Sequence, residues 1–243
     1  MTQHAFFRIT LVLLFCLNIS KVQAENIIQG GFVDFNIYPY QTKVNHDSTF
    51  TINAFLNFSN RFSYFSLTNF SDQRDSGKLP NIDTFFTEQN LRWQIAENSP
   101  FELTLQSNLR SGTHNDRHRL GIRWSLNKSE FIAPLLNRIH LKYFLNWHAV
   151  QFDHQENYIW QLEHAFSMTF PYISDRLYLS GFADHTFNEA LPKTIPNNPI
   201  VAEAQLGYKL FSNTYAVAEY RVNQYRRSNV NNVAVGLEYK KTW

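Results

Sequence analysis

The sequence has very little cysteine and no long apolar segment beyond its N-terminus. Its one cysteine, Cys16, lies in an N-terminal apolar run, so the rest of the chain carries no thiol. This excludes disulfide frameworks and zinc–thiolate sites from the mature protein. Beyond residue 24, no stretch approaches the roughly 18 to 20 apolar residues that a helical membrane span needs. If the mature chain crosses a membrane, it must therefore cross as strands.

The sequence also lacks a surplus of either charge. Of its 22 Lys and Arg residues, Arg8 and Lys21 lie in the N-terminal segment, which leaves 20 basic and 20 acidic residues. A balanced chain offers no basic surface for nucleic acid, so we expect no nucleic-acid partner. No internal repeat, Gly/Ser linker or charge run divides the chain after this segment, which predicts one domain.

The N-terminal segment has the pattern of a secretory signal peptide. His4 and Arg8 precede an apolar run from Ile9 to Leu17, and residues 22–24 place small side chains at the usual cleavage spacing. Cys16 follows a phenylalanine, whereas a lipoprotein cleavage site would have a small residue there. We therefore expect residues 1–24 to be a signal peptide without a lipid anchor, and residues 25–243 to form the mature domain.

Strict alternation of apolar and polar residues dominates the mature chain. Within residues 101–110, Phe and Leu side chains alternate with Glu, Thr, Gln and Asn. A period of two predicts strands with one apolar and one polar face. We predict twelve strands within residues 32–38, 49–59, 62–70, 85–96, 101–110, 119–126, 139–151, 158–168, 177–184, 200–209, 216–223 and 235–243.

The C-terminus ends as bacterial outer-membrane barrels end. Residues 235–243 alternate Val235, Leu237 and Tyr239 with smaller or charged side chains and then finish on Trp243. An aromatic ring there would lie at the bilayer interface. The sequence thus predicts an all-β fold, a transmembrane antiparallel up-and-down β-barrel of about 12 strands, with outer-membrane lipid around it. The C-terminal strand would be the contact for the barrel-assembly machinery.

The lengths of the connections agree with this topology. The connections after even-numbered strands are short, except residues 127–138, which we expect to hold a short interfacial helix. Polar stretches at residues 71–84, 111–117 and 188–198 follow odd-numbered strands and would reach outward.

A soluble β-sandwich is the structural alternative. Its outer faces would be the polar ones, and its core would hold an unusual load of Trp and Tyr.

The polar faces of the predicted strands carry compensated charge and several rings. Eight acidic and eight basic residues point inward, which favours neutral or zwitterionic solutes over ions of one sign. Inward rings beside hydrogen-bonding groups suit a flat heterocycle that bears a sugar. The same side chains would also suit a filled interior with a purely structural role. The predicted pore-lining residues are Phe55, Phe86, Glu88, Arg92, Glu102, Arg110, Arg119, Arg123, Phe144, His148, Glu163, Tyr178, Phe182, Asp184, Glu203, Glu219 and Arg221, and Asp34, Glu238, Lys142, Lys209 and Lys240 complete the inward charges.

Three blocks of sequence resemble a known family. They are the early hairpin around residues 50–70, the strand Phe-Phe-Thr-Glu-Gln-Asn-Leu-Arg-Trp at 85–93, and the block Arg-Leu-Tyr-Leu-Ser-Gly-Phe-Ala-Asp-His-Thr-Phe at 176–187. Their order resembles that of the Tsx-type nucleoside-specific channels of the outer membrane. The resemblance implies a twelve-stranded porin that passes nucleosides passively and uses no cofactor. Lys241 departs from the common barrel ending, in which an aromatic residue often stands two places before the last.

Two other classes of function compete with a channel. The segment Asn45-His46-Asp47-Ser48 resembles the His-x-Ser element of outer-membrane phospholipase A, although the Asn and Gly that usually follow are absent. His and Asp residues also meet at the predicted outer rim, where a metal or acid–base site would be possible. A closed structural or adhesive barrel is the third class, and the short outer loops argue against it. The rim pairings are His114 with Asp116 and His118, Asp153 with His154, and Asp184 with His185.

Overall fold

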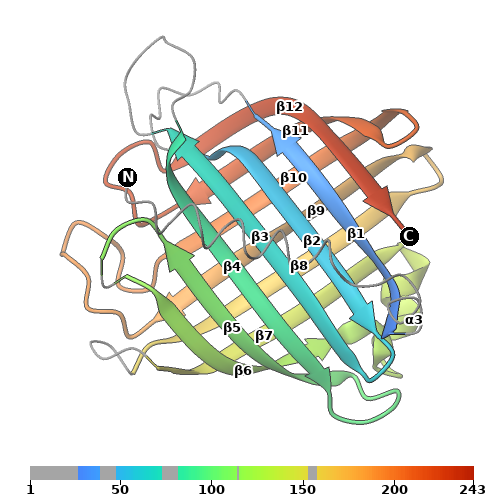
Figure 1. The fold of residues 1–243 in the computed structure, drawn as a ribbon, viewed down its shortest axis with the longest axis horizontal. Coiled ribbons are helices and arrows are strands. Elements are labelled where there is room, and N and C mark those ends of the chain that lie inside the picture. Colours follow the sequence, from blue (N-terminus) through green and yellow to red (C-terminus); the bar gives the residue numbers. More distant parts are fainter. Residues whose placement is uncertain (1–26, 39–47, 73–81, 114, 153–157) are drawn as a thin grey trace.

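The computed structural model describes residues 27–38, 48–72, 82–113, 115–152 and 158–243. Within these ranges, twelve antiparallel strands form one closed barrel in which each strand pairs with its neighbours in sequence and the last pairs with the first (Figure 1). The predicted fold class is thereby confirmed. The strands are β1 (Ile28–Ile37), β2 (Ser48–Phe58), β3 (Phe62–Asp72), β4 (Ile82–Gln94), β5 (Phe101–Arg110), β6 (Arg117–Ser125), β7 (Leu141–Gln151), β8 (Trp160–Phe170), β9 (Ser174–Phe187), β10 (Ile200–Phe211), β11 (Thr214–Asn223) and β12 (Asn231–Thr242).

The two faces of the barrel wall have opposite polarity. In β5, Leu105 is 46% exposed on the outside, whereas its neighbours Thr104 and Gln106 are fully buried on the inside. The same pattern runs around the wall, because period-two alternation places every second side chain on the same face. A soluble protein buries its apolar side chains, so this arrangement is that of a barrel whose outer surface meets lipid.

The seam between β1 and β12 closes through the last residue of the chain. The backbone N–H of Gly31 donates to the carbonyl of Trp243 at 3.1 Å, and the N–H of Trp243 donates to the carbonyl of Gly31 at 3.2 Å. Trp243 is 56% exposed. Closure leaves no strand edge unpaired. Strands in lipid must close in this way, because water is absent there to bind unpaired backbone groups.

Both ends of the described chain and all turns after even-numbered strands lie at one edge of the barrel. The connection from β6 to β7 holds a 3-10 turn, η1 (Leu126–Lys128), and a short helix, α3 (Ala133–Arg138), as predicted (Figure 1). The predicted start of β7 was wrong: Ile139 ends the helix, and His140 has a left-handed φ of 54°. No helix among the described residues is long and apolar enough to span a membrane.

The third and fourth strands depart from the pattern of the rest. Outside, Gln89 of β4 accepts a hydrogen bond from Tyr64 and donates to Ser66 at 2.8 Å and to Thr87 at 2.6 Å. These outward polar groups satisfy one another, which lowers the cost of facing lipid. Inside, β3 presents Phe65 instead of a polar residue. This inversion is the physical reason why the alternation in residues 62–70 looks irregular.

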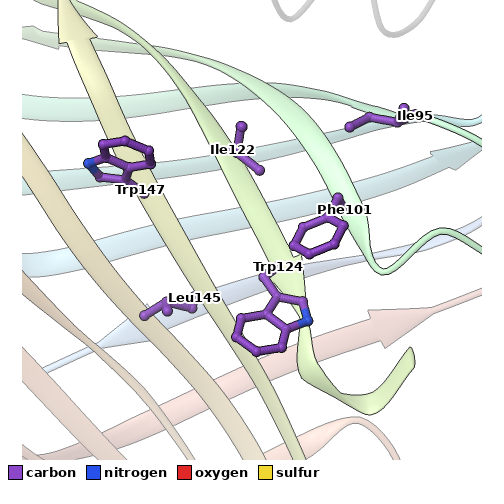
Figure 2. Close-up of a pocket in the computed structure, with 6 residues that line it drawn as sticks. All are labelled: Ile95, Phe101, Ile122, Trp124, Leu145 and Trp147. Atoms are coloured by element: carbon purple, nitrogen blue, oxygen red, sulfur yellow. The ribbon is translucent and has the colours of Figure 1, made fainter. Parts of the chain in front are cut away.

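The outer wall also carries an apolar hollow, formed by β5, β6 and β7 beside the end of β4 (Figure 2). The indole N–H of Trp124 donates to the Ser129 hydroxyl at 2.7 Å, so the polar group of this ring is already hydrogen-bonded. Such a surface fits lipid chains and has few groups that could bind a polar solute. The candidate functional site is therefore the interior. The hollow is lined by Ile95, Phe101, Ile122, Trp124, Leu145 and Trp147.

Candidate functional site in the barrel interior

A continuous hydrogen-bonded network lines the interior along β4 to β8. Gln106 is central to it, because its amide oxygen accepts from Arg119 at 2.9 Å and its nitrogen lies 3.3 Å from His148 Nε2 and 3.4 Å from Asn90 Oδ1. His148 Nε2 in turn lies 3.1 Å from a carboxylate oxygen of Glu163. We call Asn90, Gln106, Arg119, His148 and Glu163 the polar network. Each member is less than 9% exposed.

Two arginines stack on inward rings next to the polar network, on the side toward the edge that holds both chain ends. The Arg123 guanidinium lies 3.8 Å from the centre of the Phe144 ring and donates to Glu102 at 3.1 Å. Arg92 lies 5.6 Å from the centre of the Phe65 ring. A guanidinium held on an aromatic face keeps free edges for planar polar groups. This part of the wall can therefore contact a flat solute through both its rings and its cations.

Several buried polar side chains in the same wall have atoms without a hydrogen-bond partner in the part of the chain that the structure describes. Both amide atoms of Asn146, the hydroxyl of Thr104 and Nδ1 of His148 belong to this group. Cross-strand pairing places Thr104 and His148 on either side of Gly121, which has no side chain. A buried amide without partners costs about 1–3 kcal/mol, so these atoms are ready to bind water or a polar solute.

The neighbouring part of the wall, β1 to β3, is rich in aromatic side chains. Phe32, Phe55 and Phe65 are paired across β1, β2 and β3, and the rings of Phe32 and Phe55 lie 6.0 Å apart. We call these three residues the aromatic row. The ammonium group of Lys240 lies 4.4 Å from the centre of the Phe32 ring and 3.7 Å from a carboxylate oxygen of Asp34. The aromatic row thus adjoins the polar network, because Phe65 pairs directly with Asn90.

Tyr178 of β9 adds a further inward ring and depends on a glycine. Its hydroxyl donates to Glu238 and accepts from the Gln205 amide, and its ring lies directly on Gly207 of β10. A Cβ at Gly207 would lie 2.0 Å from the ring, so any other residue must displace Tyr178. The glycine is therefore what allows the ring to lie flat against the wall.

All of the predicted pore-lining positions lie on the inward face, and the structure gathers them into separate groups. The residues of β4 to β8 meet around the polar network, whereas Phe86 and Arg110 pair at the outer edge, with the guanidinium 5.2 Å from the ring centre. Glu203 and Arg221 are opposite each other in β10 and β11. Sequence reasoning missed Phe32, Phe65 and Tyr215, because apolar residues on an inward face look like lipid-facing ones in a pattern of polarity.

Water has little access to the centre of this interior. Gln106, His148 and Asn90 have no exposed surface, and Asp34 and Asn36 on the other side are only 4% and 1% exposed. Glu102, Arg123 and Lys240 have 13%, 11% and 30% exposed side chains. Passage of a solute through the buried belt therefore requires side chains to move, and the long arginines and lysine are the ones best able to do so.

The alternative sites found in the sequence are only partly covered by the structure. His46, His114, Asp153 and His154 lie outside the described residues. Asp184 faces inward, and the ring of His185 packs outside, 4.1 Å from the Phe187 ring centre. Among the described residues, no group of three or more His, Cys, Asp and Glu side chains is placed to hold a metal ion.

Comparisons with known proteins support a porin fold. Two solved structures resemble the chain: the KdgM porin, with a TM-score of 0.50 and 16% identity, and the NanC porin, with a TM-score of 0.52 and 9% identity. Each match covers 86% of this chain and 98% of the other. At such low identity the likeness shows the fold. No family model matches the sequence, and no curated protein matches it.

Proposed function

We propose that this chain forms a passive outer-membrane channel for small polar solutes, secreted with residues 1–24 as its signal peptide and assembled through its C-terminal strand. The observation that carries the proposal is the polarity of the wall: the outside is apolar apart from the polar cluster around Gln89, and the inside presents hydrogen-bonding groups from β1 to β12. The resemblance to two porins supports it. We assign no catalytic role to the interior.

We further propose that nucleosides are the favoured solutes. A nucleoside combines a flat base with a hydroxylated sugar, and the interior combines the aromatic row with the adjoining polar network. The unpartnered amide of Asn146 offers both a donor and an acceptor, which the edge of a base also presents. The compensated inward charges give no preference for anionic or cationic solutes. The Tsx-type resemblance of the sequence supports the same choice.

Single-channel recording in planar bilayers tests this function. We expect the refolded protein to give discrete conductance steps that nucleosides interrupt at submillimolar concentration, whereas sugars and amino acids at the same concentration do not. Conductance steps that no nucleoside interrupts would support the channel function and refute the specificity for nucleosides. A folded barrel without conductance would support the closed structural barrel that the buried interior also permits, and would overturn the channel itself.

Replacing Gly207 tests whether Tyr178 lines the conducting path. Gly207→Ala places a methyl group against the Tyr178 ring, so we expect the ring to move toward the lumen and the conductance to fall. The added bulk should also cost about 1–3 kcal/mol of stability. Ala218→Val, which adds bulk on the lipid-facing side of β11, is the matched control and should leave conductance unchanged. Equal conductance for Gly207→Ala and wild type would show that Tyr178 lies away from the path.

A further inference from the structure

One side chain bridges the outer mouth of the barrel. Glu189 follows β9 by two residues, in the connection to β10. One carboxylate oxygen lies 2.6 Å from Arg117 Nη2 at the start of β6, and the other accepts a hydrogen bond from the Tyr225 hydroxyl in the connection from β11 to β12. In the ring of twelve strands, β6 and β11 lie five strands apart. Glu189 therefore joins nearly opposite sides of the mouth.

The bridge is sheltered from water. The Glu189 side chain is only 6% exposed, and that of Arg117 is 20% exposed. Burial, together with the hydrogen bond to Glu189, raises the pKa of Tyr225 above its usual range, so the phenol stays protonated and remains a donor. Both carboxylate oxygens are thus held by permanent donors, which fixes the position of the charge.

The surroundings of this carboxylate are basic. Arg110 at the end of β5 and Arg119 in β6 lie within electrostatic range of Arg117 and of one another. Among the described residues, Glu189 is the buried acid that contacts Arg117, whereas Asp184 and Glu88 lie within electrostatic range of Arg119 from β9 and β4. Asp116 is exposed and accepts from the backbone N–H of Arg110 at 3.2 Å. Loss of the Glu189 charge would therefore shift the balance of charge at this edge toward the guanidinium groups.

We propose that Glu189 determines charge selectivity at the outer entrance, because its fixed carboxylate neutralises the surrounding arginines and spans the opening they border. This inference rests on the proposed channel function. A charge held near a narrow path with low-dielectric walls acts strongly on passing ions. With the carboxylate in place the positive charge at the entrance is reduced, and without it the entrance favours anions more than the wild type does.

Ion selectivity of Glu189→Gln tests the proposal. In bilayers separating two KCl concentrations, we expect the permeability ratio of chloride to potassium to rise by roughly three- to tenfold relative to wild type, with a matching shift of the reversal potential. Glutamine keeps the shape and one acceptor oxygen, so the barrel should fold. A reversal potential equal to that of wild type would overturn the proposal.

Two further variants separate charge from bridging. Tyr225→Phe removes one hydrogen bond and no charge, so selectivity should stay as in wild type while the conductance rises. Arg117→Gln removes a base and should shift selectivity toward cations. A shift toward anions in both Tyr225→Phe and Glu189→Gln would contradict a role for the charge itself. Absence of conductance in wild type would instead refute the channel, so the two failures are distinguishable.

Discussion

Leu105→Arg is expected to destabilise the refolded barrel by about 2–4 kcal/mol, because it places a charge on the lipid-facing side at mid-depth. Leu105 is central in β5, is 46% exposed, and is flanked across the strands by Leu91 and Leu120. The free energy of unfolding in lipid vesicles, followed by tryptophan fluorescence during a urea titration, measures the effect.

The same substitution nearer the water should cost much less. Ile95 lies just beyond the last residue of β4 and is 43% exposed, so Ile95→Arg is expected to cost about 0–1 kcal/mol. Leu105→Ala, which removes apolar area without adding charge, separates the two contributions. Equal costs for arginine at Leu105 and Ile95 would show that the apolar outer face does not lie in a bilayer.

Glu163→Leu is expected to cost about 3–5 kcal/mol, since it removes the acid from a buried charged cluster. Glu163 lies 3.1 Å from His148 and within electrostatic range of Arg92 and Arg123. Leucine would leave these cations buried with less compensation. The same urea titration in vesicles measures the loss.

Two controls define the origin of this effect. Glu163→Gln keeps a hydrogen bond to His148 while removing the charge, so it should cost less than leucine. Glu130→Leu changes an exposed acid outside the barrel wall and should stay within about 0.5 kcal/mol of wild type. A loss below about 1 kcal/mol for Glu163→Leu would mean that water replaces the carboxylate and that the polar network does not stabilise the barrel.

The fold was predictable because a barrel in lipid imposes a simple local rule on its sequence. Each strand must present apolar residues to one side, and this requirement is met within ten or so consecutive residues, as in β5 and β12. The same rule located α3, since residues 127–138 break the alternation. Boundaries were less certain, as His140 shows, because a strand pattern continues through residues whose backbone has already turned.

The site was only partly predictable, because alternation identifies the side of the wall and not the neighbours across the lumen. Phe65 was missed for this reason, since its inward position depends on a strand whose polar residues bond to one another outside. The contact of Tyr178 with Gly207 and Glu238 joins residues distant in sequence. No local pattern specifies such contacts.

By itself, the sequence determined that this chain forms a closed barrel with an apolar outside and a charge-compensated inside, because side-chain direction in a strand follows from a period of two. Only the tertiary structure decided which inward residues meet. The register between strands and the path of the connections place Gln106 against His148, and Glu189 between Arg117 and Tyr225. These contacts depend on the closure of the whole ring, which brings strands five places apart to opposite sides of one opening.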